Sequence, residues 1–587
     1  MKLLPESTLH QLGERLGRLY GAELSPRLMQ RLILLAQRHD LEPVKCKRPD
    51  GELWDQRDNV LITYGDLIHA PHDDHLATLQ RFLSQRLRDT IRIVHLLPFF
   101  PYSSDEGFSV IDYLEVNPAL GGWADVHAIG ADFGLMFDLV LNHCSSRSPW
   151  FECYMSGIAP FRDYFIEVEP GTDLGAVVRP RTTPLLTPVQ TPAGERCVWT
   201  TFSADQIDLD FANQDVLFEF LDILLSYVRH GARIIRLDAI AYLWKEIGSS
   251  CINLPQTHEV VKLLRDILEM LVPGVLLLTE TNLPQEQNSS YFGDGDEAHM
   301  VYQFSLPPLL LHALHTGSTR YLTDWAASLP KLPAGCTYLN FTASHDGIGV
   351  RPLEGLVPES ELQALADGIQ QRGGWISSHT REDGSESPYE FNITYYDALG
   401  GPGHPDSDLH IARFLCSQAV MLALKGIPAI YFHSLTATHN DHIGVDRNGH
   451  ARSINRRRWG EAELNALLDD SSTATSRVFH EYVRLLRLRA VHPAFHPDAV
   501  QVVLELEDGL FGLLRTALDD RELMVCVSNL SPDTRAFDLA EVATRAGASG
   551  GNWHELIKDQ PVAVGAGTTR VVLEPYQNVW LLGQAAT

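Results

Sequence analysis

The sequence predicts an α/β fold: a (β/α)8 TIM barrel with an inserted loop domain after strand 3 and a C-terminal antiparallel β domain. Three observations support this prediction. Short apolar runs alternate with amphipathic stretches over most of the chain, the rhythm breaks after the third of the strand-like runs assigned to the barrel, and from about residue 495 short strand-like runs follow one another.

The apolar runs are typical of strands that are buried on both faces. They span 59–64, 91–97, 134–140, 232–238 and 275–280, and amphipathic stretches separate them. Parallel strands that are covered by helices have this pattern. Because many such units follow one another in one region, a closed barrel is favoured over an open sheet.

Changes in composition divide the chain into parts. Leucines recur at helical spacing near the N-terminus, and the stretch from 144 onward is rich in Pro, Thr and Gly. The predicted parts are an N-terminal helical extension at 1–55, the barrel at 56–143 and 206–490, an inserted domain at 144–205, an active-site loop insertion at 355–403, and the β domain at 491–587.

Charge and cysteine content exclude several classes of partner. The 587 residues carry a formal net charge of −28, which disfavours nucleic acid and anionic membranes as partners. The eight cysteines form no CxxC pair, so we expect neither a structural zinc site nor a disulfide scaffold. The sequence contains no signal-peptide-like apolar segment and no uncharged apolar run of about 18 residues. We therefore expect a cytoplasmic protein with reduced thiols.

Polar and ionisable side chains follow the apolar runs at the point where each run ends. In a (β/α)8 barrel the C-terminal ends of the strands meet at one cleft, so these side chains are expected to converge. Charged residues beside buried strands are costly unless they are paired or used in chemistry. The residues concerned are Asp138, Asn142, His143, Arg236, Asp238, Glu280, His345 and Asp346.

Three carboxylates with an arginine and two histidines suit the chemistry of acetals. A retaining glycosidase needs one ionised carboxylate that attacks the anomeric carbon and a second, protonated group that protonates the departing oxygen. Arg236 precedes Asp238 by two residues and so lies on the same strand face, where it favours the ionised carboxylate. Glu280 is expected to lie near like charges, which favour its protonated form.

Four ordered segments resemble those of the α-amylase superfamily, glycoside hydrolase family 13. They are 138–143, 236–239, Glu280 and 345–346, and the resemblance extends from about residue 56 to the C-terminus. It implies that Asp238 is the nucleophile, that Glu280 is the acid/base, and that Asp346 stabilises the transition state.

A finer resemblance is to the sucrose phosphorylase subfamily, through 97–100, 105–108, 236–242, 345–350 and 452–456. It implies that Asp105, His143, Arg236, His345, Asp346 and Arg452 hold the glucosyl unit, with Phe108 and Phe202 against its apolar faces. It also implies that Arg181 meets phosphate and that Tyr242 lies beside the nucleophile. Phosphate is then a co-substrate, and no cofactor or metal is expected.

The chain departs from sucrose phosphorylases at the acceptor side. Asn282 replaces a histidine, the stretch 387–392 with Tyr389 and Glu390 replaces a glutamine-bearing loop, and the N-terminal 55 residues are extra. These features are similar to relatives that cleave glucosylglycerol, glucosylglycerate or sucrose 6′-phosphate. Because Glu390 would disfavour an anion at the acceptor site, the sequence favours phosphorolysis of 2-O-α-D-glucosylglycerol to α-D-glucose 1-phosphate and glycerol by reversible double displacement.

Several alternatives stay open at this point. Glucosylglycerate is the second candidate substrate, followed by sucrose 6′-phosphate or sucrose. An α-glucosidase or transglucosidase with the same three carboxylates and a catalytically inactive binding protein on the same scaffold are hypotheses of other classes. The expected partners are a small α-glucoside and phosphate, with no nucleic acid and no membrane, and a homodimer is left open.

Three other features attract attention but are given ordinary explanations. The histidine-rich stretch 69–75 resembles a metal cluster, although Asp and His at a helix start usually cap it; by the family resemblance, His69 or His72 borders the acceptor. The basic run 456–458 could suggest nucleic acid, which the net charge opposes. Lys245 lies beyond the strand that carries Asp238 and is expected to form an ion pair.

Overall fold

Eight parallel strands close into the barrel that the sequence predicts. The computed structural model describes residues 6–41, 52–180, 183–380, 386–401, 405–545, 552–563 and 570–584. The strands follow chain order around the barrel, and the last pairs with the first. They are β1 (Val60–Thr63), β3 (Ile93–Leu96), β4 (Gly134–Leu139), β9 (Ala232–Leu237), β10 (Leu276–Thr279), β11 (Met300–Tyr302), β12 (Thr337–Phe341) and β16 (Ile427–Tyr431).

The barrel strands are buried almost completely, because helices cover their outer surface and their own side chains fill the inside. Proline at the first turn of α7 and the Asn213 side chain, which caps α6, help to fix where two of these helices begin. The larger helices are α3 (His75–Arg86), α4 (Trp123–Asp132), α6 (Gln214–Arg229), α7 (Pro255–Leu271), α9 (Leu306–Thr316), α10 (Arg320–Ser328), α13 (Asp408–Ala423), α16 (Glu461–Asp469) and α17 (Ala474–Val491).

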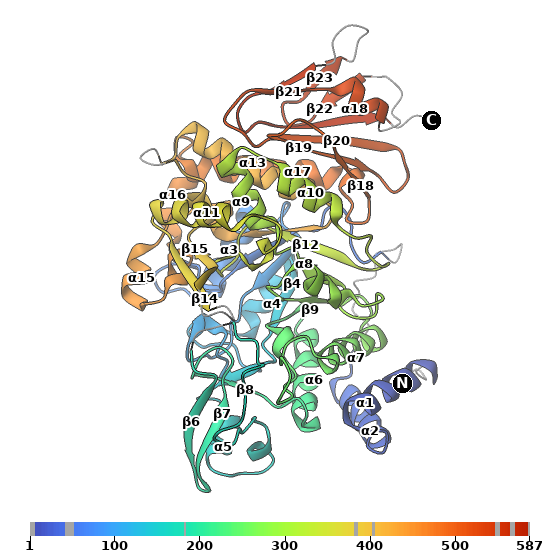
Figure 1. Cartoon of the computed structure of the whole chain (residues 1–587), viewed down its shortest axis with the longest axis vertical. Helices are drawn as coiled ribbons and strands as arrows, with labels where there is room; N and C mark the ends of the chain where they lie inside the picture. Colours follow the sequence, from blue (N-terminus) through green and yellow to red (C-terminus); the bar gives the residue numbers. More distant parts are fainter. Residues whose placement is uncertain are drawn as a thin grey trace.

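A loop domain projects from the barrel after β4, the third barrel strand, and occupies the lower part of Figure 1. Strand β5 pairs antiparallel with β8, which sets His143 opposite Asp208. The first and last strands of this segment therefore lie together at the barrel, while a hairpin extends away from it. The elements are β5 (His143–Ser145), α5 (Pro149–Met155), β6 (Leu186–Thr191), β7 (Gly194–Trp199) and β8 (Gln206–Asp208).

The N-terminal leucine periodicity corresponds to two helices, α1 (Glu6–Tyr20) and α2 (Ser25–His39), that pack on α7 and α6 (Figure 1). Arg15 is buried in this contact, where it pairs with Asp266 and lies 3.3 Å from Glu259. The extension is therefore fixed to the two helices that lead into β9 and β10.

A small antiparallel sheet stands over the barrel between β12 and β16. Its strands in spatial order are β13 (Ile348–Gly349), β15 (Glu386–Asn392) and β14 (Trp375–Thr380). Helix α11 (Glu359–Gln371) lies between β13 and β14 in the chain. Gly349 is in register with Glu390, so β15 is brought next to the turn that follows β12.

The C-terminal domain is an antiparallel sheet, as predicted, and forms the red upper part of Figure 1. Its strands in spatial order are β18 (Val500–Leu504), β19 (Leu510–Thr516), β20 (Glu522–Asn529), β25 (Asn578–Gln584), β22 (Asn552–Glu555) and β23 (Gln560–Ala563), with β21 (Arg535–Asp538) paired to β24 (Arg570–Leu573) beside them. Within the residues described, no helix has the length and apolarity needed to cross a bilayer.

Arg489 joins the barrel to the segment that enters the C-terminal domain. Its side chain is 1% exposed, and its guanidinium donates hydrogen bonds to backbone carbonyls from four separate parts of the chain. Buried carbonyls need such donors because water cannot reach them. The acceptors are the carbonyl oxygens of Gln56, Asp58, Leu422, Gly426 and Phe495.

We expect Arg489→Met to lower the free energy of unfolding by about 3 kcal/mol, because several buried carbonyls lose their donor together. Urea unfolding followed by tryptophan fluorescence measures this change. Arg477→Met is the matched control on the same helix, since the exposed Arg477–Asp408 pair contributes at most about 0.5 kcal/mol. Equal effects of the two substitutions would contradict the role given to Arg489.

Candidate active site

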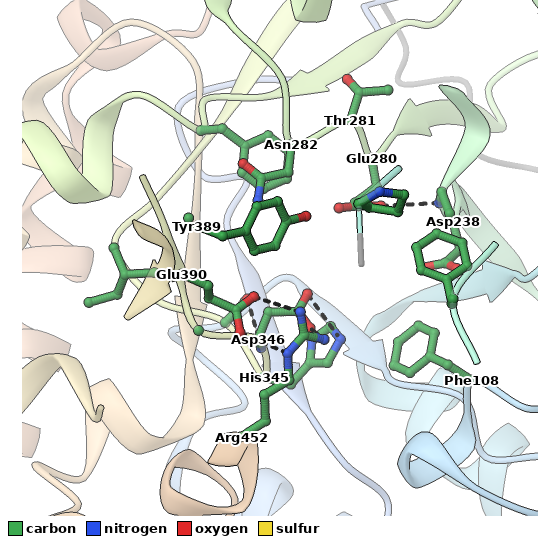
Figure 2. A pocket seen from close by; sticks show the side chains of 18 of the residues that line it. Phe108, Asp238, Glu280, Thr281, Asn282, His345, Asp346, Tyr389, Glu390 and Arg452 are labelled. Atoms are coloured by element: carbon green, nitrogen blue, oxygen red, sulfur yellow. Dashed lines mark hydrogen bonds and ion pairs between the residues drawn. The ribbon is translucent and has the colours of Figure 1, made fainter. Parts of the chain in front are cut away.

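One pocket at the C-terminal ends of the barrel strands collects the side chains that the sequence singled out. All predicted site residues line it except Arg181, which lies outside the described residues. Figure 2 shows Glu280 next to Asp238, with Asp346, Arg452 and Glu390 linked in a second group. The lining includes Asp105, Phe108, His143, Phe202, Arg236, Asp238, Tyr242, Glu280, Asn282, His345, Asp346, Tyr389, Glu390 and Arg452.

Asp238 follows β9 directly and is held by a chain of buried charges. The Arg236 guanidinium donates to Asp238 Oδ1 at 2.7 Å and to Asp138 Oδ1 at 2.5 Å. The other Asp138 oxygen lies 2.7 Å from His95 Nε2. Burial raises the pKa of Asp238 to about 7, and the Arg236 charge opposes this rise. Arg236 is thus where the sequence predicts it, but burial outweighs its effect and the Asp238 pKa is raised overall.

Glu280 follows β10 directly, beside Asp238, and no cation of the described residues lies within hydrogen-bond distance of it. Its Oε2 accepts a hydrogen bond from the Ala239 N–H and lies 4.0 Å from Arg236 Nη2. Burial raises the pKa of Glu280 to about 7, and the charges of Asp238 and Asp346 raise it further against the effect of Arg236. The two acids therefore titrate as a pair, and the closer arginine favours the charge on Asp238 and the proton on Glu280.

Asp346 lies in the turn after β12 and is ionised. Although burial alone would raise its pKa, Arg452, His345, Arg456 and Arg236 together hold that pKa well below its usual range. Arg452 Nη1 is 2.5 Å from Asp346 Oδ1. Of the three carboxyl groups predicted to be catalytic, Asp346 is thus the one whose pKa the neighbouring cations lower.

The floor of the pocket carries an aromatic ring and two imidazoles that are neutral at neutral pH. The rings of Phe108 and His345 stack with their centroids 4.9 Å apart, and His143 Nε2 lies 2.9 Å from the carbonyl oxygen of Phe108. Burial lowers the pKa of His345 to about 3 and also lowers that of His143, so both imidazoles are neutral hydrogen-bonding groups at neutral pH.

Asp105 occupies this floor in a strained backbone conformation. Its φ is +51° and that of Glu106 is +47°, a left-handed conformation that residues other than glycine rarely adopt twice in succession. Gln206 Nε2 donates to Asp105 Oδ2 at 3.3 Å and lies 3.2 Å from His143 Nε2. Nothing in the sequence indicated Gln206, because it lies in the three-residue strand β8, which is too short to show a periodic pattern.

Glu390 is arranged differently from what the sequence suggested. Its side chain is 2% exposed, and Arg452 binds both oxygens, with Nε 3.0 Å from Oε1 and Nη2 2.6 Å from Oε2. The fork offsets the charge of the carboxylate, although Arg452 also binds Asp346. The expectation that Glu390 repels an anionic acceptor therefore loses its physical basis.

Asn282 presents an unused acceptor atom at the same side of the pocket. Its buried Oδ1 has no hydrogen-bond partner in the described part of the chain. A Cβ atom at Gly349 would lie 2.5 Å from Asn282 Nδ2, and one at Gly347 would lie 2.4 Å from Glu390 Cγ. The two glycines allow both side chains to approach the turn after β12.

The remaining predicted residues fall into three groups. The Tyr242 ring meets Phe202 edge-on at 5.6 Å, beside the pocket. Lys245 Nζ lies 2.6 Å from Asp208 Oδ2, which agrees with the expected ion pair. His69 lines a neighbouring hollow with the basic run 456–458 rather than this pocket, and the Asp74 side chain forms no cap hydrogen bond with α3.

Among the described residues no group of three or more His, Cys, Asp or Glu side chains could hold a metal ion.

We expect Glu280→Gln to stabilise the protein at pH 8 by about 2–3 kcal/mol. A carboxyl group whose pKa is raised on folding costs stability above its folded pKa, and that cost disappears as pH falls below its unfolded pKa. Urea unfolding at pH 8 and at pH 4 therefore should show a gain only at the higher pH. Glu286→Gln, at an exposed position on the next helix, α8 (Gln285–Ser289), is the control and changes stability by less than about 0.5 kcal/mol. A gain of equal size at both pH values would contradict the raised pKa.

Known proteins share this fold and much of this sequence. The family described as "Alpha amylase, catalytic domain" matches residues 90–346. Glucosylglycerate phosphorylase of Allomeiothermus silvanus is 43% identical over 97% of this chain and 98% of its own, and that of Escherichia coli is 40% identical over 97% and 99%. Glucosylglycerol phosphorylase of Marinobacter adhaerens is 28% identical over 74% and 87%.

A solved structure gives the same result. Sucrose 6F-phosphate phosphorylase from Thermoanaerobacter thermosaccharolyticum superposes with a TM-score of 0.71 at 26% identity, over 81% of this chain and 94% of that one. The four strand-end segments thus lie in a shared fold that is matched along nearly the whole chain. The chain belongs to the glycoside phosphorylases of the α-amylase superfamily, glycoside hydrolase family 13.

Proposed function

We propose that this protein is a retaining glucosylglycerate phosphorylase, which converts glucosylglycerate and phosphate reversibly into α-D-glucose 1-phosphate and glycerate. The observation that carries the proposal is the 40–43% identity, over 97% of the chain, to two glucosylglycerate phosphorylases. The pocket supports it because Asp238, Glu280 and Asp346 line one cavity in different electrostatic environments.

The first half of the reaction transfers the glucosyl unit to the enzyme. The Asp238 carboxylate attacks the anomeric carbon while Glu280 gives its proton to the departing glycerate oxygen, so the glycosidic bond breaks and a β-glucosyl ester forms on Asp238. Arg236, which bonds Asp238 directly, favours the ionised form of Asp238, and burial favours the protonated form of Glu280. Asp346 would stabilise the positive charge that develops on the sugar ring.

The second half returns the glucosyl unit to phosphate. One phosphate oxygen attacks the same carbon and Glu280, now a carboxylate, takes up a proton from phosphate as the ester bond to Asp238 breaks. Two inversions at one carbon retain the α configuration. In this proposal Asp105, His143, Arg236, His345 and Arg452 hold the sugar hydroxyls, Phe108 and Phe202 contact its apolar faces, and Arg181 binds phosphate.

Glycerate is favoured over glycerol as the acceptor for two reasons. The relatives at 40–49% identity are glucosylglycerate phosphorylases, whereas the glucosylglycerol phosphorylase is 28% identical. The argument for glycerol rested on a free charge at Glu390, and that charge is paired with Arg452. Asn282, Tyr389 and Tyr242 line the pocket where the acceptor would lie, and the Asn282 Oδ1 atom can accept a hydrogen bond from an acceptor hydroxyl.

The proposed enzyme needs no cofactor, since phosphate is the second substrate. We place it in the cytoplasm because the seven cysteines in the described residues carry free thiols.

An acceptor screen from α-D-glucose 1-phosphate tests the substrate assignment. We expect phosphate release with D-glycerate to be at least about tenfold faster than with glycerol, fructose or fructose 6-phosphate, because a site with fixed polar partners discriminates by roughly that much or more. Asp238→Asn is the control for background release. Faster release with glycerol would return the assignment to glucosylglycerol.

Trapping the glucosyl enzyme separates a phosphorylase from a hydrolase and from an inactive scaffold. We expect 2-deoxy-2-fluoro-α-D-glucosyl fluoride to leave a fluoroglucosyl adduct on Asp238, which peptide mass spectrometry locates. Phosphate should accelerate loss of the adduct more than tenfold over buffer, since phosphate is the proposed second nucleophile. Loss at the same rate in both solutions would identify a hydrolase, and an unlabelled Asp238 would contradict the mechanism.

A further inference from the structure

Side chains from one segment hold the turn that carries His345 and Asp346. Asn455 Nδ2 donates to the carbonyl oxygens of Ser344 and Asp346 at 2.6 and 3.3 Å. Arg456 Nε donates to the carbonyl oxygen of His345 at 2.9 Å. All three successive carbonyls of the turn thus have a partner in Asn455 or Arg456, a pair that we call the carbonyl clamp.

The clamp is itself held rigidly. Asn455 and Arg456 are 3% and 4% exposed, and the Tyr431 hydroxyl, at the end of β16, donates to the Asn455 carbonyl oxygen at 2.8 Å. The Arg456 guanidinium carbon lies 5.7 Å from the centroid of the Tyr64 ring, and this ring meets His345 edge-on. Burial and these contacts restrict the movement of both residues.

The same segment also binds the carboxylate of Asp346. Arg452, three residues before Asn455 in η6 (Ala451–Asn455), donates to Asp346 Oδ1, whereas Arg456 Nη2 lies 3.9 Å from that oxygen. Contacts from 452–456 therefore fix Asp346 at both its side chain and its backbone. A carboxylate that stabilises a transition state must already point at the reacting carbon before the reaction begins, and contacts to both its side chain and its backbone keep it there.

We propose that Asn455 and Arg456 are positioning residues, which set the place of Asp346 relative to the anomeric carbon and thereby control the rate of glucosyl transfer. The proposal rests on the glucosyl-transfer half of the proposed function and is independent of the acceptor. Neither residue is required to touch the reacting atoms. Loss of the clamp should lower kcat, because Asp346 acts mainly in the transition state, and should leave KM nearly unchanged.

Two variants of Arg456 isolate the hydrogen bond from the charge. In Arg456→Gln the amide nitrogen occupies the same place along the side chain as the arginine Nε and keeps a donor for the His345 carbonyl. Arg456→Met has the same length but no donor. Both variants lose the positive charge near Glu106, so their difference reports the carbonyl contact alone.

Fluoride release from α-D-glucosyl fluoride in the presence of phosphate is the assay, because this donor needs neither glycerate nor a proton from Glu280. We expect kcat of Arg456→Gln to exceed that of Arg456→Met about 30-fold, with KM values within about threefold and unfolding midpoints within about 2 °C. Equal kcat values, or a difference confined to KM, would overturn the positioning role. Absence of fluoride release by the unmodified protein would overturn the proposed function instead.

A variant of Asn455 tests the clamp by protonation. Asn455→Asp keeps the shape but replaces the Nδ2 donor with oxygen, which can bind the two carbonyls only when it carries a proton. We expect its kcat relative to the unmodified protein to rise at least about fivefold as pH falls from 8 to 5.5. A ratio that does not change with pH would contradict the positioning role of the clamp. This test remains valid even if Arg456→Met does not fold.

Discussion

The pocket depends on one buried cation, Arg236. Its guanidinium is shared between Asp138 and Asp238, and it lies 4.0 Å from Glu280, so three strand ends are oriented by one side chain. A charge 2% exposed to solvent is tolerated only when its partners supply the lost hydration. The closed barrel provides these partners, because it brings the ends of β4, β9 and β10 side by side.

A second arginine separates the roles of the three carboxyl groups. Arg452 binds Asp346 and Glu390, and with neighbouring cations it lowers the Asp346 pKa. Asp238 has Arg236, whereas Glu280 has only a backbone N–H within hydrogen-bond distance among its described contacts. The unequal supply of positive charge thus favours the proton on Glu280 over Asp238, which is the distribution that the proposed mechanism requires.

Much of this could be predicted from the sequence, and the failures have a physical cause. Buried strands that end in charged residues predict both the barrel and the convergence of Asp238, Glu280 and Asp346, because strand order alone determines where the ends meet. Which arginine pairs with which carboxylate depends on loops, and Arg452 is 62 residues from Glu390. From the sequence, Glu390 was expected near the acceptor as an unpaired charge, and this expectation favoured glycerol as the acceptor. Gln206 and the carbonyl clamp carry no periodic signal and became visible only in the fold.

The paired state of Glu390 changes how acceptor selection has to be explained. Because its charge is paired with Arg452, Glu390 is a weak source of repulsion, and in the proposed function shape and hydrogen-bonding atoms such as Asn282 Oδ1 account for selection. Gly347 and Gly349 have no side chain, and a Cβ at either position would collide with Glu390 or Asn282. In the proposed function, this bare backbone turn, whose carbonyls Asn455 and Arg456 bind, would form one wall of the acceptor site. Positioning of Asp346 and the shape of the acceptor site are thus consequences of one local structure.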